Sequence, residues 1–201
     1  MIKSEIFKNN ICLETEELKL RPSELSDVGL FAEISSPSIW EFMSYDLENI
    51  SDWQKFISNS IENRKNQVAQ EFAIIQKPTN KLIGATSICS ISEFDKKVEI
   101  GLTWFSESYQ GKGINQKVKL ILLSFLFDQI KVNKVEFRTR GGNLKSQRAL
   151  DKIGAVKEGI LRELIFRNGK YIDVVYYGIL ASEWKNIKEG LLKINTGANN
   201  V

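Results

Sequence analysis

The residues of this chain that are best suited to hold an anion form a glycine-rich loop at residues 109–115, with the sequence YQGKGIN. Its two glycines let the backbone turn sharply and approach a ligand closely. An amphipathic helical pattern follows the loop, and the first turn of a helix presents unpaired N–H groups and a partial positive charge. The loop therefore predicts a phosphate-binding site. Seen alone, however, such a turn more often only joins a strand to a helix.

A second polar segment, residues 143–155 (NLKSQRALDKIGA), begins with an amide and a hydroxyl that could contact a ligand. A helix is expected over 144–153, ended by Gly154. Asn143 could equally cap this helix, and Ser146 could hydrogen-bond its own backbone. The first loop is neither a Walker loop nor a G-x-G-x-x-G motif, because Lys112 is not placed as a Walker lysine and the third glycine is missing. The two segments together are more specific than either one.

Histidine does not occur in the sequence. Its absence excludes the usual general base, Ser-His and Cys-His nucleophile pairs and His-ligated metal sites. Chemistry must therefore use carboxylates, hydroxyls, backbone dipoles or a bound cofactor. Cys12 and Cys89 lie in predicted strands and are expected to be thiols in the core.

The elements that must position these residues belong to one predicted domain at 1–190, followed by a C-terminal tail at 191–201. The 201 residues are 42% hydrophobic and 26% charged, which suits one core. The net charge of +3 comes from interspersed signs and weakly favours anionic ligands. No apolar run approaches the roughly 20 residues of a membrane helix, and the start lacks a signal-peptide pattern. We therefore expect a cytoplasmic protein with no membrane partner.

The hydrophobic patterns predict an α+β order of elements. A strand or hairpin at 11–21 precedes two helices, at 26–35 with Ser26 as N-cap and from Ser51 onward. Three antiparallel strands, a helix, a strand, a helix and a final hairpin joined at Asn168-Gly169 follow. The predicted later elements are 72–75, 82–88, 97–105, 114–130, 135–139, 144–153, 156–166 and 171–180.

With these elements in place, the chain resembles the GNAT superfamily of acyl-CoA-dependent N-acyltransferases, within it the RimJ/RimL-like branch of ribosomal-protein N-terminal acetyltransferases. The resemblance covers residues 11–190. It rests on matches to the family's Q/R-x-x-G-x-G/A and N-x-x-S/A…G-A/F patterns, namely Gln110, Gly113 and Asn115, then Asn143, Ser146, Ala149 and Gly154-Ala155. It implies a GNAT fold: a mixed, mostly antiparallel sheet of about seven strands with flanking helices and a splayed central parallel pair.

The resemblance also implies acetyl-CoA as acyl donor and no metal. Loop amides would hold its pyrophosphate, and free backbone groups on the strand before the loop would pair with its pantetheine arm as an added strand does. Asn115 departs from the small residue usual at its position. The expected cofactor-binding residues are Leu102, Thr103, Trp104, Phe105, Gln110, Gly111, Lys112, Gly113, Ile114, Asn115, Asn143 and Ser146.

For catalysis, Glu99 is the expected general base, taking a proton from the amine directly or through water. Alternation along its strand equally permits an outward-facing Glu99. A backbone N–H near Thr103 is the expected oxyanion donor. The tyrosine that many family members carry in the second helix is Leu150 here, so Ser146 is the expected proton relay or thiol-binding residue. Of Tyr176 and Tyr177, one must point into the core and the other away.

The leading hypothesis is an acetyl-CoA-dependent N-acetyltransferase acting on a primary amine, either a protein N-terminus or a small molecule, as a monomer or homodimer. The alternative is a non-catalytic acyl-CoA-binding module. Nucleic-acid binding through residues 131–152 is disfavoured, because only Phe137 there could stack on a base. Four early acidic residues could attract a cationic acceptor but could equally be solvated charges: Glu33, Glu41, Asp46 and Glu48.

Overall fold

The computed structural model describes residues 1–9, 11–43 and 45–195. Its strands form one eight-stranded sheet in the order β1-β2-β3-β4-β5-β6-β8-β7, antiparallel except for the pair β5 and β6. This confirms the α+β sheet with one parallel pair, the strand beyond the expected seven being accounted for by the two-residue β1. The strands are β1 (Leu13–Glu14), β2 (Leu18–Pro22), β3 (Gln70–Gln76), β4 (Lys81–Ser92), β5 (Lys97–Phe105), β6 (Lys134–Arg140), β7 (Val156–Arg167) and β8 (Lys170–Leu180).

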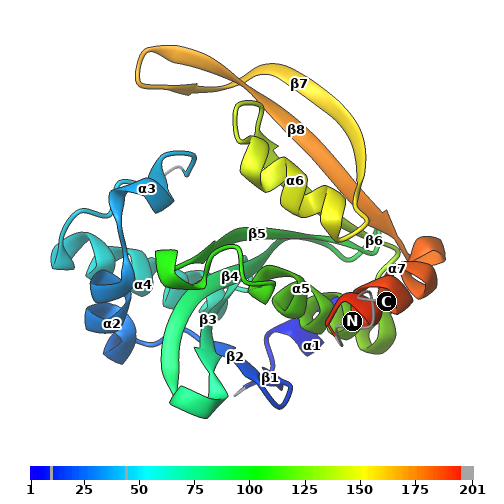
Figure 1. Cartoon of the computed structure of the whole chain (residues 1–201), viewed down its shortest axis with the longest axis horizontal. Helices are drawn as coiled ribbons and strands as arrows, with labels where there is room; N and C mark the ends of the chain where they lie inside the picture. Colours follow the sequence, from blue (N-terminus) through cyan, green and yellow to red (C-terminus); the bar gives the residue numbers. More distant parts are fainter. Residues whose placement is uncertain (10, 44, 196–201) are drawn as a thin grey trace.

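Helices cover both faces of the sheet (Figure 1). The larger core packs α1, α5 and α7 against one face, and a smaller aromatic core packs α2, α3 and α4 against the other. The helices are α1 (Ile2–Ile6), α2 (Val28–Ile34), α3 (Pro37–Trp40), α4 (Ile50–Lys65), α5 (Ile114–Ser124), α6 (Leu144–Lys152) and α7 (Ala181–Asn195), with short turns η1 (Leu25–Asp27), η2 (Lys77–Thr79), η3 (Glu107–Tyr109) and the π-helical η4 (Phe125–Ile130).

The polar residues before the first helices set where those helices begin. Glu24 and Asp27 form a reciprocal capping box around η1, so the prediction of Ser26 as N-cap was wrong. The Asp27 carboxylate also accepts two hydrogen bonds from Arg21, while the Ser26 hydroxyl donates to Glu24 Oε2 at 3.4 Å. The helix α4 starts at Ile50, where Asn49 caps it through the backbone N–H of Asp52.

The β7–β8 hairpin turns where the sequence predicted it. Asn168 and Gly169 both adopt positive φ angles, 51° and 74°, as a two-residue hairpin turn requires. The hairpin projects beyond the rest of the sheet, beside α6 (Figure 1). On β8, Tyr177 points into the core while the half-buried Tyr176 points to the other face, which confirms the expected split between the two tyrosines.

Three helices had no counterpart in the predicted order of elements: α1, α3 and α7. The last of these runs to Asn195 and buries Leu191, so residues 191–195 of the expected tail are helical. Residues 196–201 lie outside the described residues. The cysteine prediction was wrong for Cys12, which is exposed and precedes β1. Within the described part of the chain, no helix is both long and apolar enough to cross a membrane.

The parallel pair at the centre of the sheet is short. β5 and β6 are in register only from Lys97 to Glu99 on β5 and from Lys134 to Glu136 on β6. Beyond these residues β6 pairs with β8 alone, and β5 pairs with β4 alone. The two strands therefore diverge, and the glycine loop and α5 begin beyond the open end (Figure 1).

Candidate active site

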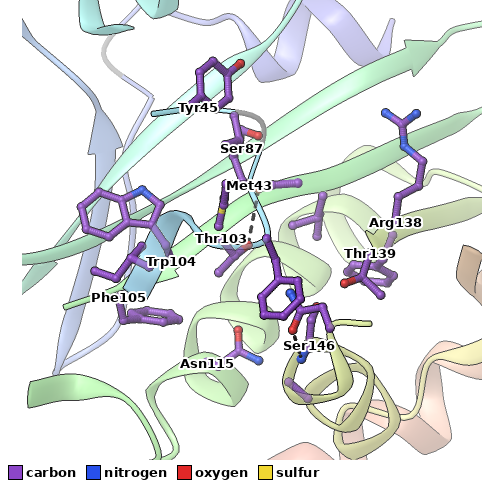
Figure 2. Close-up of a pocket in the computed structure, with 18 of the residues that line it drawn as sticks. Met43, Tyr45, Ser87, Thr103, Trp104, Phe105, Asn115, Arg138, Thr139 and Ser146 are labelled. Atoms are coloured by element: carbon purple, nitrogen blue, oxygen red, sulfur yellow. Dashed lines mark hydrogen bonds between the residues drawn. The ribbon is translucent and has the colours of Figure 1, made fainter. Parts of the chain in front are cut away.

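A cavity of about 1960 Å³ lies at the divergence of β5 and β6. Its walls come from both strands, the glycine loop, α6, the segment around α3 and α4, and the β7–β8 hairpin. Figure 2 shows Thr103 in the middle, between Trp104 and Phe105 of β5 on one side and Arg138 and Thr139 of β6 on the other. The structure thus brings the two sequence motifs together around one space.

The glycine loop has the backbone geometry of an anion cradle. Gly111 and Gly113 have φ angles of +74° and +77°, in the region that glycine adopts most readily. A Cβ at Gly111 would meet nothing within 4 Å, and one at Gly113 would meet only Gln116 Oε1 at 3.8 Å. The side of the loop where side chains would stand is therefore open, and α5 starts at Ile114 with its first amides unpaired. These features fit a pyrophosphate.

The residues of this loop differ in where they point. Gln110, Gly113, Ile114 and Asn115 line the cavity together with Gly111. Lys112 does not line it, and its Nζ lies 6.0 Å from the centre of the Tyr109 ring.

Gln110 ties the loop to its surroundings. Its Nε2 donates to the carbonyl oxygen of Phe105 at 2.9 Å, and its Oε1 accepts a hydrogen bond from Lys145 of α6. This side chain therefore bridges the end of β5 and the start of α6, so it sets the width of the cleft between the two motifs.

Asn143 caps α6, as one of its two possible roles predicted. Its Oδ1 accepts a hydrogen bond from the backbone N–H of Ser146 at 3.0 Å. Both residues line the cavity, with Ser146 visible at its edge in Figure 2. Leu150, one turn further, is buried in the larger core.

A bulge in β5 frees backbone groups inside the cavity. Trp104 pairs with Ala85 and Gly101 pairs with Ser87, so Leu102 and Thr103 together face one residue of β4. Leu102 has a φ angle of +47°, which marks the distortion. A bulge re-aims backbone groups away from the ladder, and it does so here beside the glycine loop. Trp104 and Phe105 are buried at its end, in the smaller and larger core respectively.

Glu99 points into the cavity from the face that also carries the aromatic core. Glu99 is only 6% exposed, so the alternative that it faces outward from the strand into solvent is wrong. Arg138 Nη2 lies 2.7 Å from Glu99 Oε2, which also accepts a hydrogen bond from Ser90 at 3.0 Å. The hydrogen bond between Arg138 and Glu99 raises the pKa of the Arg138 guanidinium. Glu99 is thus a carboxylate held in one orientation, beside the half-buried Tyr176 that stacks under Arg138.

A polar cluster that the sequence reasoning missed lies under the bulge. Lys119 of α5 is 3% exposed and donates from Nζ to Thr103 Oγ1 at 2.7 Å. Thr103 Oγ1 also lies 2.8 Å from Thr86 Oγ1. Burial lowers the pKa of Lys119 to about 7. The signal was present: helical spacing puts Lys119 on the same face as the core residues Leu122 and Leu123.

The far wall of the cavity carries a second buried ionisable group. Glu71 of β3 is 5% exposed, and its Oε1 has no hydrogen-bond partner among the described residues. Burial raises its pKa to about 7, while the nearby Ser23 and Arg64 oppose the shift. Its cross-strand partner is Ser87, which in turn pairs with Gly101. The part of the cavity wall formed by β3 therefore carries a buried carboxyl group.

The remaining early acidic residues divide between cavity and surface. Glu41 and Asp46 line the cavity, and Asp46 receives hydrogen bonds at 2.7 Å from Arg167 of the hairpin. Glu33 and Glu48 are exposed and outside it. Cys89 also lines the cavity, but burial raises the pKa of its thiol to about 11, which disfavours the reactive thiolate.

Comparisons with known proteins agree with this geometry. A family model described as an acetyltransferase (GNAT) domain matches residues 17–156. The putative ribosomal N-acetyltransferase YdaF of Bacillus subtilis is 33% identical over 107 residues, covering 53% of this chain and 58% of that relative. The ribosomal-protein-serine acetyltransferase of Escherichia coli is 27% identical over 176 residues, covering 81% of this chain and 96% of the relative.

Among solved structures, a putative acetyltransferase from T. thermophilus superposes with a TM-score of 0.80 at 25% identity, covering 90% of this chain and 94% of the other. The family model spans the glycine loop, the β5 bulge, Glu99 and the whole of α6. The chain therefore belongs to the GNAT family of acetyltransferases, with ribosomal-protein acetyltransferases among its relatives.

Proposed function

We propose that this protein transfers an acetyl group from acetyl-CoA to a primary amine by direct attack of the amine on the thioester. The observation that carries the proposal is the open end of the β5–β6 pair beside the glycine loop, within one cavity. Acetyl-CoA supplies an activated acyl group on a thiol leaving group.

On the donor side, the amides of Gly111, Lys112, Gly113 and Asn115 are assigned to the pyrophosphate. Lys112 takes part through its backbone only, since its side chain lies over Tyr109. The strand from Leu102 to Phe105 is assigned to the pantetheine arm, which would pair with backbone groups as an edge strand does. The bulge supports this assignment because it takes Leu102 and Thr103 out of register with β4.

At the reacting carbon, the amine must lose a proton and the carbonyl oxygen must be stabilised. Glu99 is assigned as general base, because it is a buried carboxylate held by Arg138 at the cavity wall. A backbone N–H of the bulge, at or beside Thr103, is assigned to the carbonyl oxygen. Ser146 is assigned to the departing thiol, whose reference pKa of about 8.5 lets it leave as a thiolate with little help.

For the acceptor we favour an α-amine, as at a protein N-terminus. Its reference pKa of about 8 leaves more of it unprotonated at neutral pH than a lysine amine with a pKa of about 10.4. YdaF and the Escherichia coli relative are both named for ribosomal targets, which supports a protein as acceptor. Small-molecule amines remain the second class to test.

Two measurements test the proposal. Acetyl-CoA at 100 times its Kd should stabilise the fold by about 2.7 kcal/mol, and no rise in Tm at saturation would exclude a donor site. Acetyl-CoA consumption is then followed against peptides and small amines with wild type, Glu99→Gln and the matched control Glu136→Gln on the neighbouring strand. We expect Glu99→Gln to lower kcat by about 100-fold with donor affinity retained.

The outcomes separate the alternatives. Donor binding without turnover of any amine would favour a non-catalytic acyl-CoA-binding module. Turnover that Glu99→Gln leaves unchanged across the pH range would remove Glu99 from the role of base.

A further inference from the structure

Lys119 is a buried amine whose surroundings offer it no negative charge. Its Nζ meets the Thr103 hydroxyl from β5, shares that hydroxyl with Thr86 of β4, and lies 5.6 Å from the centre of the Phe137 ring of β6. No carboxylate contributes to the shift of its pKa; burial alone does. Among the described residues it therefore has a hydroxyl and a ring as partners and no counter-ion.

The carboxylates around the cavity are on the other side of the sheet or already engaged. Glu99 alternates with Val98 and Ile100 and faces the aromatic core, where Arg138 and Ser90 bind it. Lys119 approaches from the opposite face, within α5. A buried ammonium without a counter-ion is costly, and yet this one is placed at the cavity wall rather than in the closed core.

The position of Lys119 relative to the bulge suggests what its charge is for. A threonine hydroxyl oxygen is three single bonds from its own backbone nitrogen, a separation of at most about 4 Å, so the 2.7 Å hydrogen bond places Nζ within about 7 Å of the Thr103 nitrogen. The backbone N–H there is assigned above to the carbonyl oxygen of the thioester. Negative charge that develops on this carbonyl oxygen would act as the counter-ion that Lys119 lacks among the described residues.

We propose that Lys119 is a charge-stabilising residue beneath the reaction centre, with its ammonium group held by Thr103 and serving the negative charge that develops on the thioester carbonyl oxygen. This rests on the proposed function. The amine nitrogen bonds to the carbonyl carbon, its proton passes to Glu99, the carbon–sulfur bond breaks and the electron pair leaves on sulfur. The Lys119 charge is needed only while the oxygen is anionic.

The first test uses two donor analogues that differ in charge at the acyl position: S-carboxymethyl-CoA, which carries a carboxylate, and the neutral S-acetonyl-CoA. We expect wild type to bind the anionic analogue at least about tenfold more tightly, and Lys119→Met to lose that preference. At pH 8, where Lys119 is mostly neutral, wild type should take up close to one proton on binding the anionic analogue. Titration calorimetry in buffers of different ionisation enthalpy measures this uptake.

The matched control is Lys117→Met. Lys117 lies on the same helix but is ion-paired with Glu17 at 2.5 Å and is 27% exposed, so its loss should change neither preference nor proton uptake. Lys119→Met removes a buried amine and should fold with an unchanged or higher Tm. Thr103→Val gives a second variant, which keeps Lys119 but removes its anchor and should weaken the preference partially.

The second test follows kcat for acetyl transfer against pH in wild type and Lys119→Met. The ratio of the two cancels the ionisation of the acceptor, which both share. We expect kcat of wild type divided by kcat of Lys119→Met to be about 10 to 100 at low pH. This ratio should fall as pH rises and Lys119 loses its proton. A ratio that does not vary with pH, or equal binding of the two analogues by wild type, would overturn the role of Lys119. If neither analogue binds wild type, the donor site itself is wrong, which is a separate failure of the proposed function.

Discussion

Backbone groups form one side of the cavity, and side chains form the other. The side that we propose holds the donor is made of backbone groups: positive-φ glycines, the first amides of α5 and a bulge in β5. The other side, formed by the segment around α3 and α4, β3 and the β7–β8 hairpin, is the side that we propose receives the acceptor; it consists of side chains from distant segments, joined by a few polar contacts such as Asp46–Arg167 and the hydrogen bond from Arg140 to the carbonyl oxygen of Met43. Backbone geometry tolerates most changes of side chain, whereas an assembled wall changes with each of them. The difference teaches that the proposed donor site can be inferred from local motifs, whereas the acceptor site cannot.

The sharpest way to test this contrast is to alter the donor backbone alone. Gly113→Val forces a β-branched residue into a φ of +77°, which strains the loop by about 1–3 kcal/mol and displaces its amides. We expect the Kd for CoA to rise by at least about 100-fold, measured by calorimetry, with little change in Tm.

Gly169→Val is the matched control, since Gly169 has a φ of +74° and open space around it at the hairpin tip. It imposes the same strain far from the loop. If both variants bind CoA as wild type does, the glycine loop is not the pyrophosphate site.

The next largest effect should come from the buried acid of the acceptor wall. Glu71 keeps its proton in the folded state up to a pKa of about 7, whereas the unfolded chain ionises near its ordinary value of 4.5. Between these values the folded state binds more protons, so the free energy of unfolding should fall as pH rises, by up to about 3 kcal/mol. Glu71→Gln should remove this fall, measured by urea denaturation at pH 4.5 to 8.

Lys119 should make the free energy of unfolding depend on pH in the opposite direction to Glu71. Its pKa is lowered from 10.5 to about 7, so between these values the unfolded chain binds more protons and stability should rise with pH. Lys119→Met should remove that rise. If the free energy of unfolding varies with pH in the same way for wild type, Glu71→Gln and Lys119→Met, neither side chain is desolvated.

A smaller effect is expected at Ser146, which contributes a hydroxyl to the donor side. If Ser146 binds the departing thiol as proposed, Ser146→Ala removes one hydrogen bond, and such a bond is worth about 0.5–1.5 kcal/mol. We expect kcat to fall by at most about tenfold, with the Kd for acetyl-CoA nearly unchanged, in steady-state kinetics. Gln147→Ala, one residue along α6, is the comparison. A fall beyond about 100-fold would make Ser146 an essential acid.

The smallest effect should come from the contact between the hairpin and the early loop. Arg167→Gln breaks the ion pair with Asp46, a pair of the exposed kind that is worth up to about 1 kcal/mol. We expect the acceptor KM to change up to about fivefold while the donor KM stays constant. Asp46→Asn should give the same change, and the double variant no more than either, in a double-mutant cycle. A change in donor KM would mean that the two sides are coupled.

The sequence predicted most of the elements because their signals are local. Gly154 ends α6 and Asn168-Gly169 turns the hairpin through φ angles that few other residues favour. Ser26 failed as a cap because Glu24 and Asp27 form the capping box, with Asp27 also bound by Arg21 six residues before it. The helix α3 is a single turn after Pro37, too short for a periodic pattern to show.

The convergence of the glycine loop and the start of α6 on one cavity was predictable for the same reason, since both motifs are short and contiguous. The cluster of Lys119, Thr103 and Thr86 was not, because it joins three elements that only packing brings together. Glu71 was missed likewise, since one acidic residue in a β-strand pattern does not reveal which face it takes. The orientation of Glu99 needed the register of β4 and β5, which no local pattern specifies.

The three-residue register between β5 and β6 has a mechanical consequence. Among the described residues it is the only strand pairing between β1–β5 and the strands β6, β8 and β7, and the larger core and the ion pair of Arg138 with Glu99 also connect the two parts. A pantetheine arm paired with the backbone there would add hydrogen bonds beside this short pairing. Donor binding would then stabilise both parts of the sheet together. It would be detected as slower hydrogen exchange in β5 and β6 at the same time.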